Sequence, residues 1–192
     1  MNIEFKPETH EYFIDGFRYP SVTEILQIAN NFSAVNKELL VRSQHFGTAV
    51  HKACELWDEK KLNEEILSPP IIPYLDAWKK FIEETGFTIL ASEYRIASMY
   101  GYAGTLDRYG ILDGKHVIID IKTGIPQRTT ALQTAAYAQA IGEGGGQIDG
   151  RYSIQLKPLR YSLQAYTNDR DFFSFKSFLD VYKWRENNVR AC

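Results

Sequence analysis

The amino-acid sequence predicts an α/β fold, and two local patterns lead to that prediction. Two apolar runs are joined by Asp113-Gly114, and Asp-Gly between strand-like runs is the strongest short signal for a β-hairpin. Helical periodicity flanks this hairpin on both sides, over residues 37–59 and 131–141. The chain has 192 residues, of which 44% are hydrophobic, so about one domain with a sizeable core is expected.

The N-terminal sequence pattern predicts a small β-meander followed by a helix. Residues 2–20 alternate apolar and polar side chains around two turn sequences. Ser21 and Glu24 then form a capping-box pattern, in which each side chain accepts a hydrogen bond from a free N–H group at a helix start. We expect the helix near 23–29.

The 37–59 helix carries an apolar stripe and the first candidate site residue, His51. Glu55 lies one helical turn after His51 on the same side. Two interpretations follow: a surface or core-edge histidine paired with Glu55, or a metal ligand, for which neutral imidazole is well suited.

A loop over 61–70, a helix over 72–85 that ends at Gly86, and a strand over 87–98 are expected next. Alternation along the strand places Glu93 on the same face as Arg95. Glu93 can therefore point toward the acids of the hairpin or pair with Arg95 on the surface.

The Asp113-Gly114 turn predicts a definite register for the hairpin. If Leu112 pairs with Lys115, Asp107 lies opposite Asp120. Facing carboxylates repel, so this pair requires a cation, a shared proton or another register. Asp120 and Lys122 share a face, while Val117, Ile119 and Ile121 point to the other side, into a core. The alternative is a solvated strand edge without chemistry.

After the hairpin, Thr129 or Thr130 is expected to cap a helix over 131–141. Gln133 and Tyr137 are four residues apart on this helix and share a face. They are either site residues or an exposed amide and a half-buried aromatic. A second hairpin about Pro158 (151–157 and 160–167) and a terminal helix over 169–188 complete the chain.

Composition excludes several classes of protein. The formal net charge of −2 argues against a broad electrostatic grip on nucleic acid. Two cysteines are too few for a disulfide framework or a four-cysteine metal site. No apolar run is long enough to span a bilayer and no signal peptide is evident. We expect a soluble cytoplasmic protein of a bacterial or phage-infected cell with no membrane association.

The motifs and their order resemble the RecB-type branch of the PD-(D/E)xK nuclease superfamily, which includes phage-type exonucleases and the mitochondrial genome maintenance exonuclease. The resemblance covers about 45–155. The matching segments are Gly47 to Glu55, Gly104-Thr105-Leu106-Asp107, Asp120-Ile121-Lys122-Thr123-Gly124 and Gln133-Thr134-Ala135-Ala136-Tyr137.

This resemblance implies a restriction-endonuclease-like fold with a mixed central β-sheet flanked by helices. The whole chain, 1–192, would be a single nuclease domain. Its core would span approximately 45–167, with the β-meander at 1–20 and the C-terminal helix at 169–188.

The resemblance also implies a set of residue roles. Mg²⁺ or Mn²⁺ would be held by His51, Asp107, Asp120, the Ile121 carbonyl and Glu93, since oxygen ligands suit these ions. Catalytic roles fall to Asp107, Asp120, Lys122, Gln133 and Tyr137. DNA phosphates would contact Arg128, Arg151 and Lys157. Iron–sulfur members need four cysteines, so no such cluster is expected, and without a P-loop pattern no ATP use is expected.

The function implied is a metal-dependent DNA exonuclease acting on single-stranded DNA or a free end. A phage-type role in recombination, repair or degradation is expected, with a recombination or replication protein as partner. The alternatives are a non-catalytic DNA-binding scaffold of the same fold, a structure-specific endonuclease, or a ribonuclease.

Overall fold

The computed structural model describes residues 2–29 and 37–189. Its elements are, in chain order, β1 (Ile3–Lys6), β2 (Glu11–Ile14), β3 (Phe17–Tyr19), α1 (Val22–Leu26), α2 (Lys37–Asp58), the short 3₁₀ helix η1 (Glu64–Ile66), α3 (Ile72–Thr85), β4 (Thr88–Ser98), β5 (Tyr102–Leu112), β6 (Lys115–Lys122), α4 (Thr129–Glu143), β7 (Gly150–Lys157), β8 (Arg160–Ala165) and α5 (Asp171–Val189). The α/β class is confirmed.

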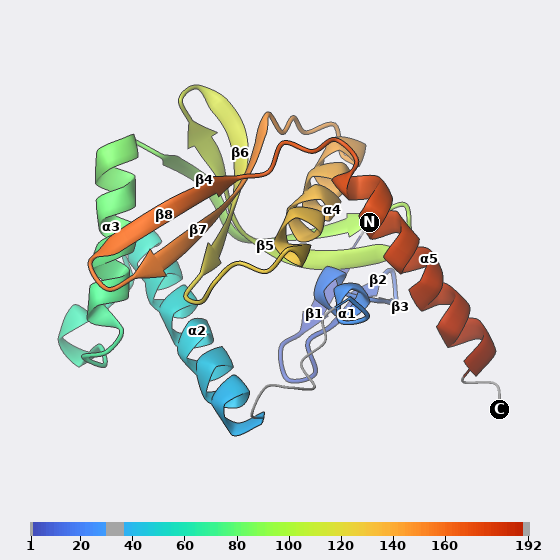
Figure 1. The fold of residues 1–192 in the computed structure, drawn as a ribbon, viewed down its shortest axis with the longest axis horizontal. Helices are drawn as coiled ribbons and strands as arrows, with labels where there is room; N and C mark the ends of the chain where they lie inside the picture. The colour runs from blue at the N-terminus through green and yellow to red at the C-terminus, as the bar shows by residue number, and fades with distance from the viewer. Residues whose placement is uncertain (1, 30–36, 190–192) are drawn as a thin grey trace.

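A mixed five-stranded sheet forms the centre of the molecule, with the strand order β4-β5-β6-β7-β8 (Figure 1). Its neighbouring strands are antiparallel except β6 and β7, which are parallel. Parallel neighbours need a long crossover connection, and α4 lies in the connection between them.

Two apolar cores lie on opposite faces of β6, because successive side chains of a strand alternate. Ile118 packs in one core with residues of α1, α4 and α5. Val117, Ile119 and Ile121 pack in the other with residues of α2 and α3, as expected. The mixed sheet is therefore covered by helices on both faces.

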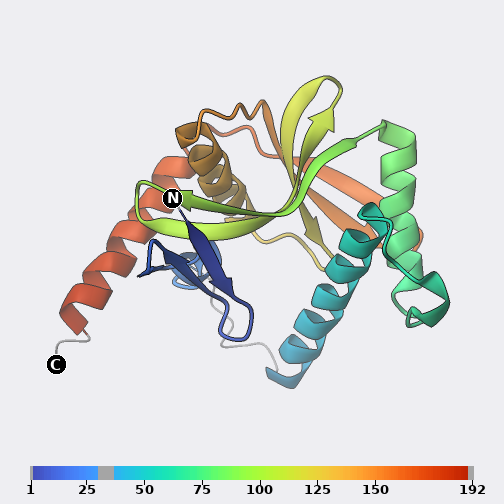
Figure 2. The same cartoon turned by 180° about the vertical axis from the view of Figure 1, so that it is seen from behind.

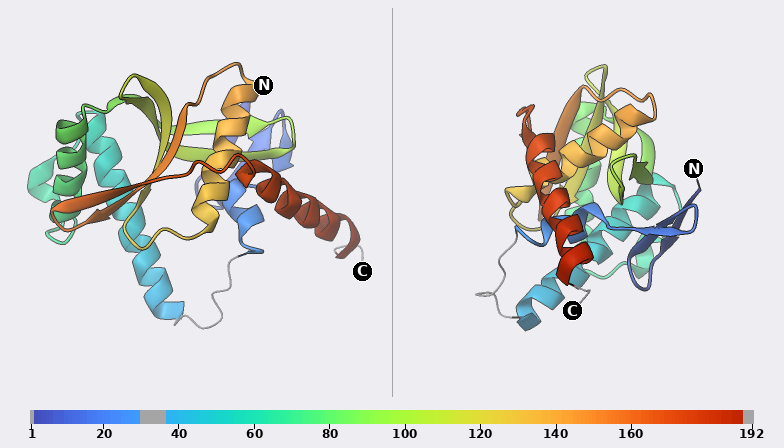
Figure 3. Two further views of the ribbon diagram at one scale, coloured as in Figure 1. Left: turned by 45° about the horizontal axis from the view of Figure 1, so that its top comes forward. Right: turned by 90° about the vertical axis from the view of Figure 1, so that its right-hand side faces the viewer.

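The three N-terminal strands form a separate antiparallel sheet, β1-β2-β3, which confirms the meander. Tyr12 and Ile14 of this sheet are buried with Ala103 of β5. Figure 2 shows the sheet beside β4 and β5, and Figure 3 shows it next to α1 in two further views. This packing brings residues 3–19 close to the strands that carry Glu93 and Asp107.

The Asp113-Gly114 hairpin has the predicted turn and register. Asp113 and Gly114 have φ values of 51° and 73°, as a type I′ turn requires. Leu112 pairs with Lys115, and the ladder continues in the same register to Arg108 and Ile119. The paired ladder ends there, one position before Asp107 and Asp120.

The helix boundaries confirm some capping predictions and correct others. The capping box of Ser21 and Glu24 is present, although α1 ends at Leu26 rather than near residue 29. Gly86 ends α3 with φ of 64°. The predicted threonine cap of α4 is wrong, because Arg128 already has helical φ and ψ and occupies the cap position without a side-chain bond. Among the described residues, no helix is long and apolar enough to cross a membrane.

Candidate metal centre

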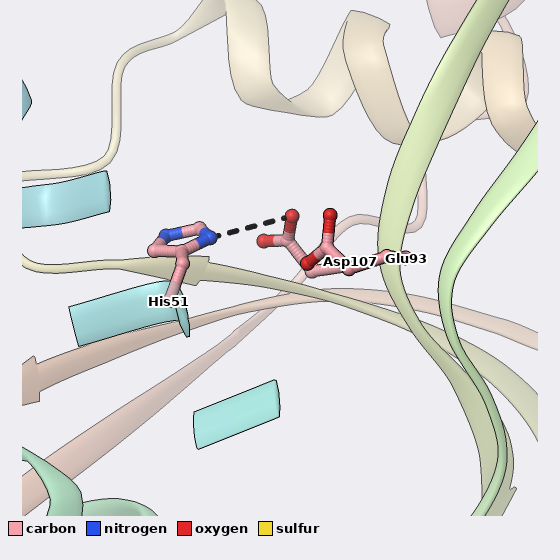
Figure 4. Close-up of side chains that lie close together, drawn as sticks. All are labelled: His51, Glu93 and Asp107. Carbon is pink, nitrogen blue, oxygen red and sulfur yellow. Dashed lines mark ion pairs between the residues drawn. The ribbon is translucent and has the colours of Figure 1, made fainter. Parts of the chain in front are cut away.

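Three side chains from three separate elements converge on the β4–β5 side of the mixed sheet. His51 lies on α2, Glu93 on β4 and Asp107 on β5, and their side chains point toward one another (Figure 4). One potential ligand atom of each lies within 4.8 Å of the other two. The His51 Nδ1 atom lies 3.5 Å from Asp107 Oδ1.

The close approach of α2 to the sheet places His51 at this point. A Cβ atom at Gly47, one turn before His51, would lie 3.3 Å from the Thr123 hydroxyl, so a larger residue would require the Thr123 side chain to shift. Glu55 forms an ion pair with Lys52 at 2.7 Å, whereas the ion-pair partner of His51 is Asp107. Of the two interpretations of His51, the surface pair with Glu55 is therefore absent.

Glu93 reaches the site through an unusual backbone conformation. The register of β4 against β5 shifts between Ile89 and Ala91, and Glu93 itself has φ of +47°, which is uncommon outside glycine. The paired residues on either side place Glu93 opposite Asp107. Its carboxylate lies 3.5 Å from Arg108 Nη1, whereas the Arg95 guanidinium lies over the Phe5 ring.

The Asp107 side chain forms a hydrogen bond from β5 to β6 at the point where the main-chain ladder between the two strands ends. Its Oδ2 atom accepts a hydrogen bond of 2.6 Å from the Ile121 N–H. Ile121 is also paired with Ile154 of β7. The main chain of β6 thereby fixes one carboxylate oxygen of Asp107, while the other faces His51.

Asp120 and Lys122 form an ion pair beside the cluster. Lys122 Nζ lies 2.8 Å from Asp120 Oδ2, and the Asp120 side chain is only 3% exposed. The same Oδ2 atom lacks a well-aligned hydrogen bond to any described residue. Its contact among the described residues is therefore the Lys122 ammonium. Asp120 is not part of the three-residue group.

Burial and mutual charge set the protonation of the acids. Burial raises the pKa of Glu93 to about 7, with Asp107 adding to the rise and Arg108 opposing it. Burial also raises the pKa of Asp120 to about 6, despite the opposing charge of Lys122. In Asp107 the effect of burial is outweighed by the charges of His51 and Lys122 and by the Ile121 N–H, and the pKa falls to about 2.

Burial acts to lower the pKa of His51, but the charge of Asp107 more than offsets it and the pKa rises. Without metal, His51 and Asp107 thus favour an ion pair.

Gln133 and Tyr137 of α4 are in direct contact. Gln133 Nε2 donates to Tyr137 Oη at 3.0 Å, and burial raises the pKa of Tyr137 well above its usual range. The Tyr137 ring packs over Gly104, where a Cβ atom would lie 2.7 Å from the ring. The charges of Asp120 and Asp107 add to this rise of the Tyr137 pKa.

Comparison with known proteins gives the family. A family model described as the PD-(D/E)XK nuclease superfamily matches residues 21–176. The chain belongs to the PD-(D/E)xK nuclease superfamily. Its substrate class is accordingly nucleic acid. No curated protein matches the chain. A solved structure described as "Crystal structure of SSO0001" is 16% identical, with a TM-score of 0.36 over 69% of this chain and 71% of the other.

The residues present in this PD-(D/E)xK chain fit the divalent ion that the superfamily uses. Glu93 and Asp107 offer carboxylate oxygens and His51 an imidazole nitrogen, a mixed donor set that can hold a divalent cation. The Asp120 carboxylate, whose Oδ2 atom pairs with Lys122, would offer a further oxygen. Three protein ligands would leave coordination positions for water or substrate, because Mg²⁺ and Ca²⁺ take six or more ligands.

The basic residues predicted to contact DNA lie in different settings. Arg128 is exposed at the start of α4, and Lys157 is half-buried at the end of β7. Arg151 instead donates to the carbonyl oxygens of Ala131 and Asn168 and to Asp171, each at 2.9 Å. Its guanidinium therefore joins α4 to the start of α5.

One buried cation next to the cluster, Arg108, was not among the residues predicted from the sequence. The Arg108 side chain is fully buried and pairs with Asp58 of α2 at 2.6 Å. The sequence held a weak signal, since Arg108 is in the same alternating set of strand positions as Leu106 and Leu112 and a buried arginine needs an acid as partner. The identity of that acid, 50 residues away in the sequence, could not be read from the pattern.

Proposed function

We propose that this chain is an Mg²⁺- or Mn²⁺-dependent deoxyribonuclease that degrades DNA from a free, single-stranded end. The observation that carries the metal-dependent part is the convergence of His51, Glu93 and Asp107 beside the Asp120–Lys122 pair. Digestion from an end, a phage-type origin and a role in recombination, repair or degradation come from the RecB-type resemblance. A recombination or replication protein that supplies the DNA belongs to the same proposal.

Each residue has a proposed role. His51, Glu93, Asp107, Asp120 and the Ile121 carbonyl would hold the ion, which when bound makes water more acidic and offsets charge on phosphate oxygens. Lys122 would orient the attacking water or stabilise negative charge as it develops. Gln133 and Tyr137 would position the substrate.

The DNA path is proposed from the basic side chains that remain accessible. Arg128 and Lys157 would contact phosphates, which fix the position of DNA without reading its sequence. The contacts of Arg151 within the protein give no support to its phosphate role. We therefore propose that Arg151 instead holds α4 against α5.

The test is cleavage of end-labelled linear and closed circular single-stranded DNA by Asp120→Asn and Lys122→Met variants. Both substitutions remove charge and keep similar side-chain volume. We expect Mg²⁺- or Mn²⁺-dependent digestion by the unaltered protein and a loss of at least about 100-fold in each variant. The Lys176→Met variant, which breaks a surface ion pair on α5, should keep full activity.

Different outcomes separate the alternatives. Undiminished cleavage by both site variants would refute the catalytic assignment, and binding of DNA without any cleavage would favour the scaffold. Cleavage of closed circles would favour an endonuclease, and faster cleavage of matched RNA would favour a ribonuclease.

A further inference from the structure

Arg108 is an unusual residue for the interior of a protein. Its side chain has no exposed surface, and the partner acid Asp58 is only 3% exposed. A buried charge is costly unless it is paired and hydrogen-bonded. The hydrogen-bond and ion-pair partners of Arg108 therefore indicate its role.

One side of the Arg108 guanidinium is anchored by residues outside the metal centre. Nε donates to Asp58 Oδ2 at 2.6 Å, and the other oxygen of Asp58 accepts a 2.8 Å bond from Trp78 Nε1. The guanidinium also lies over the Trp78 ring, 5.5 Å from its centroid. Residues of α2 and α3 thus fix both the edge and the face of the planar group.

The other side of the guanidinium contacts both strands that carry the clustered acids. Nη1 donates at 2.6 Å to the main-chain carbonyl of Asp107 and lies 3.5 Å from the Glu93 carboxylate. Nη2 has no hydrogen-bond partner among the described residues. The orientation of the group therefore rests on Nε and Nη1 and on the Trp78 ring.

We propose that Arg108, anchored by Asp58, is a positioning residue that fixes Glu93 against Asp107 at the spacing needed to share one divalent ion. This inference rests on the metal-dependent function proposed above. It accounts for the strained backbone of Glu93, whose φ of +47° needs a surrounding structure that holds it. A lysine could not replace Arg108, because its single ammonium lacks the fork that spans separate acceptors.

The test is the affinity of the intact protein for Mn²⁺, measured by calorimetry without DNA. We expect Arg108→Lys and Asp58→Asn to raise the Kd for Mn²⁺ by about tenfold or more, the usual effect of losing a residue that orients metal ligands. Asp58→Asn keeps an oxygen for Trp78 but loses the charge that holds Arg108.

A matched control separates positioning from simple loss of stability. Tyr102 lies on the same strand, and its buried hydroxyl donates to the Ala136 carbonyl at 2.8 Å. Tyr102→Phe removes this bond and should lower the melting temperature without changing the Kd for Mn²⁺. A purely structural role for Arg108 would give the same result as this control.

A second readout shows whether Arg108 acts through Glu93. In a Glu93→Gln background, Arg108→Lys should raise the Kd less than it does in the unaltered protein, because coupled residues are non-additive. Equal effects in both backgrounds, or an unchanged Kd in folded Arg108→Lys and Asp58→Asn proteins, would refute the proposal. If Arg108→Lys does not fold, Asp58→Asn alone decides the result.

The outcomes that would refute the proposed function differ from those that would refute the role of Arg108. If the unaltered protein binds no Mn²⁺, or binds it equally well after Asp107→Asn, the metal centre itself is refuted. If the unaltered protein binds Mn²⁺ through Asp107 and only the Arg108 and Asp58 variants are without effect, the metal centre stands and the positioning role does not.

Discussion

At the scale of single residues, the acids of the cluster differ in charge because their surroundings differ. Asp107 accepts a main-chain N–H and faces His51, whereas Glu93 sits opposite an acid that is already ionised. These contacts lower the pKa of Asp107, whereas burial, reinforced by the charge of Asp107, raises the pKa of Glu93 to about 7. Like charges placed this close cannot all ionise at low cost without a cation.

We predict that Mn²⁺ affinity rises as the pH increases from about 5.5 to 8. The ion must displace the proton of Glu93, whose pKa is about 7, and the proton of His51, whose pKa is raised, so binding releases protons. Calorimetry in two buffers of different ionisation enthalpy measures both the Kd and the proton release. Affinity that is flat across this range would contradict the assigned ligands.

In the metal-free protein, the free energy of unfolding should fall as the pH rises. A carboxyl group whose pKa is higher in the folded than in the unfolded state binds more protons when folded, so stability falls as the pH rises between the two values. For Glu93 that interval runs from about 4.5 to about 7. Urea unfolding in the presence of a chelator should show the decrease, and Glu93→Gln should reduce it.

At the scale of elements, the contact between β5 and α4 depends on the absence of a side chain at Gly104. A Cβ atom there would lie 2.7 Å from the Tyr137 ring and 3.4 Å from Val22. Tyr137 is buried and bonded to Gln133, so the ring has little room to move. The position of α4 relative to the site therefore depends on this glycine.

We predict that Gly104→Ala lowers the free energy of unfolding by about 1–3 kcal/mol, the usual cost of overpacking a core. The matched control is Gly142→Ala, where the added methyl group meets nothing within 4 Å. Gly142 lies within α4, so alanine there should stabilise by up to about 1 kcal/mol. Urea unfolding measures both, and effects of the same sign would contradict the packing described for Gly104.

At the scale of the whole molecule, folding brings together ligands that lie far apart in the sequence. His51, Glu93 and Asp107 come from a helix and two strands, and each element reaches the site through different core contacts. Such a site exists only in the folded state. Metal binding must therefore stabilise the fold as a whole.

We predict that Mn²⁺ at 100 times its Kd raises the free energy of unfolding by about 2.7 kcal/mol, the value expected from mass action for one site. Thermal and urea unfolding with and without the ion measure this change, which Asp107→Asn should abolish. NaCl at matched ionic strength provides the comparison for general salt effects. Equal stabilisation of the Asp107→Asn variant would show that the ion binds elsewhere.

The sequence by itself determined the features that depend on neighbouring residues. The Asp113-Gly114 turn fixed the hairpin register as far as Arg108 and Ile119, since positive φ is tolerated there. The Ser21–Glu24 capping box and the end of α3 at Gly86 are equally local. Candidate site residues could be named because their motifs resemble a known family.

Only the tertiary structure decided which of these residues meet. From the sequence alone, His51 could pair with Glu55, and Glu93 could pair with Arg95. Helix and strand periodicity show which residues share a face, but they do not show which residue of another element each side chain contacts. The shifted register of β4, the end of the β5–β6 ladder and the burial of Arg108 against Asp58 arise from contacts between distant segments. Packing on both faces of the sheet, which no single segment encodes, brings His51, Glu93 and Asp107 together.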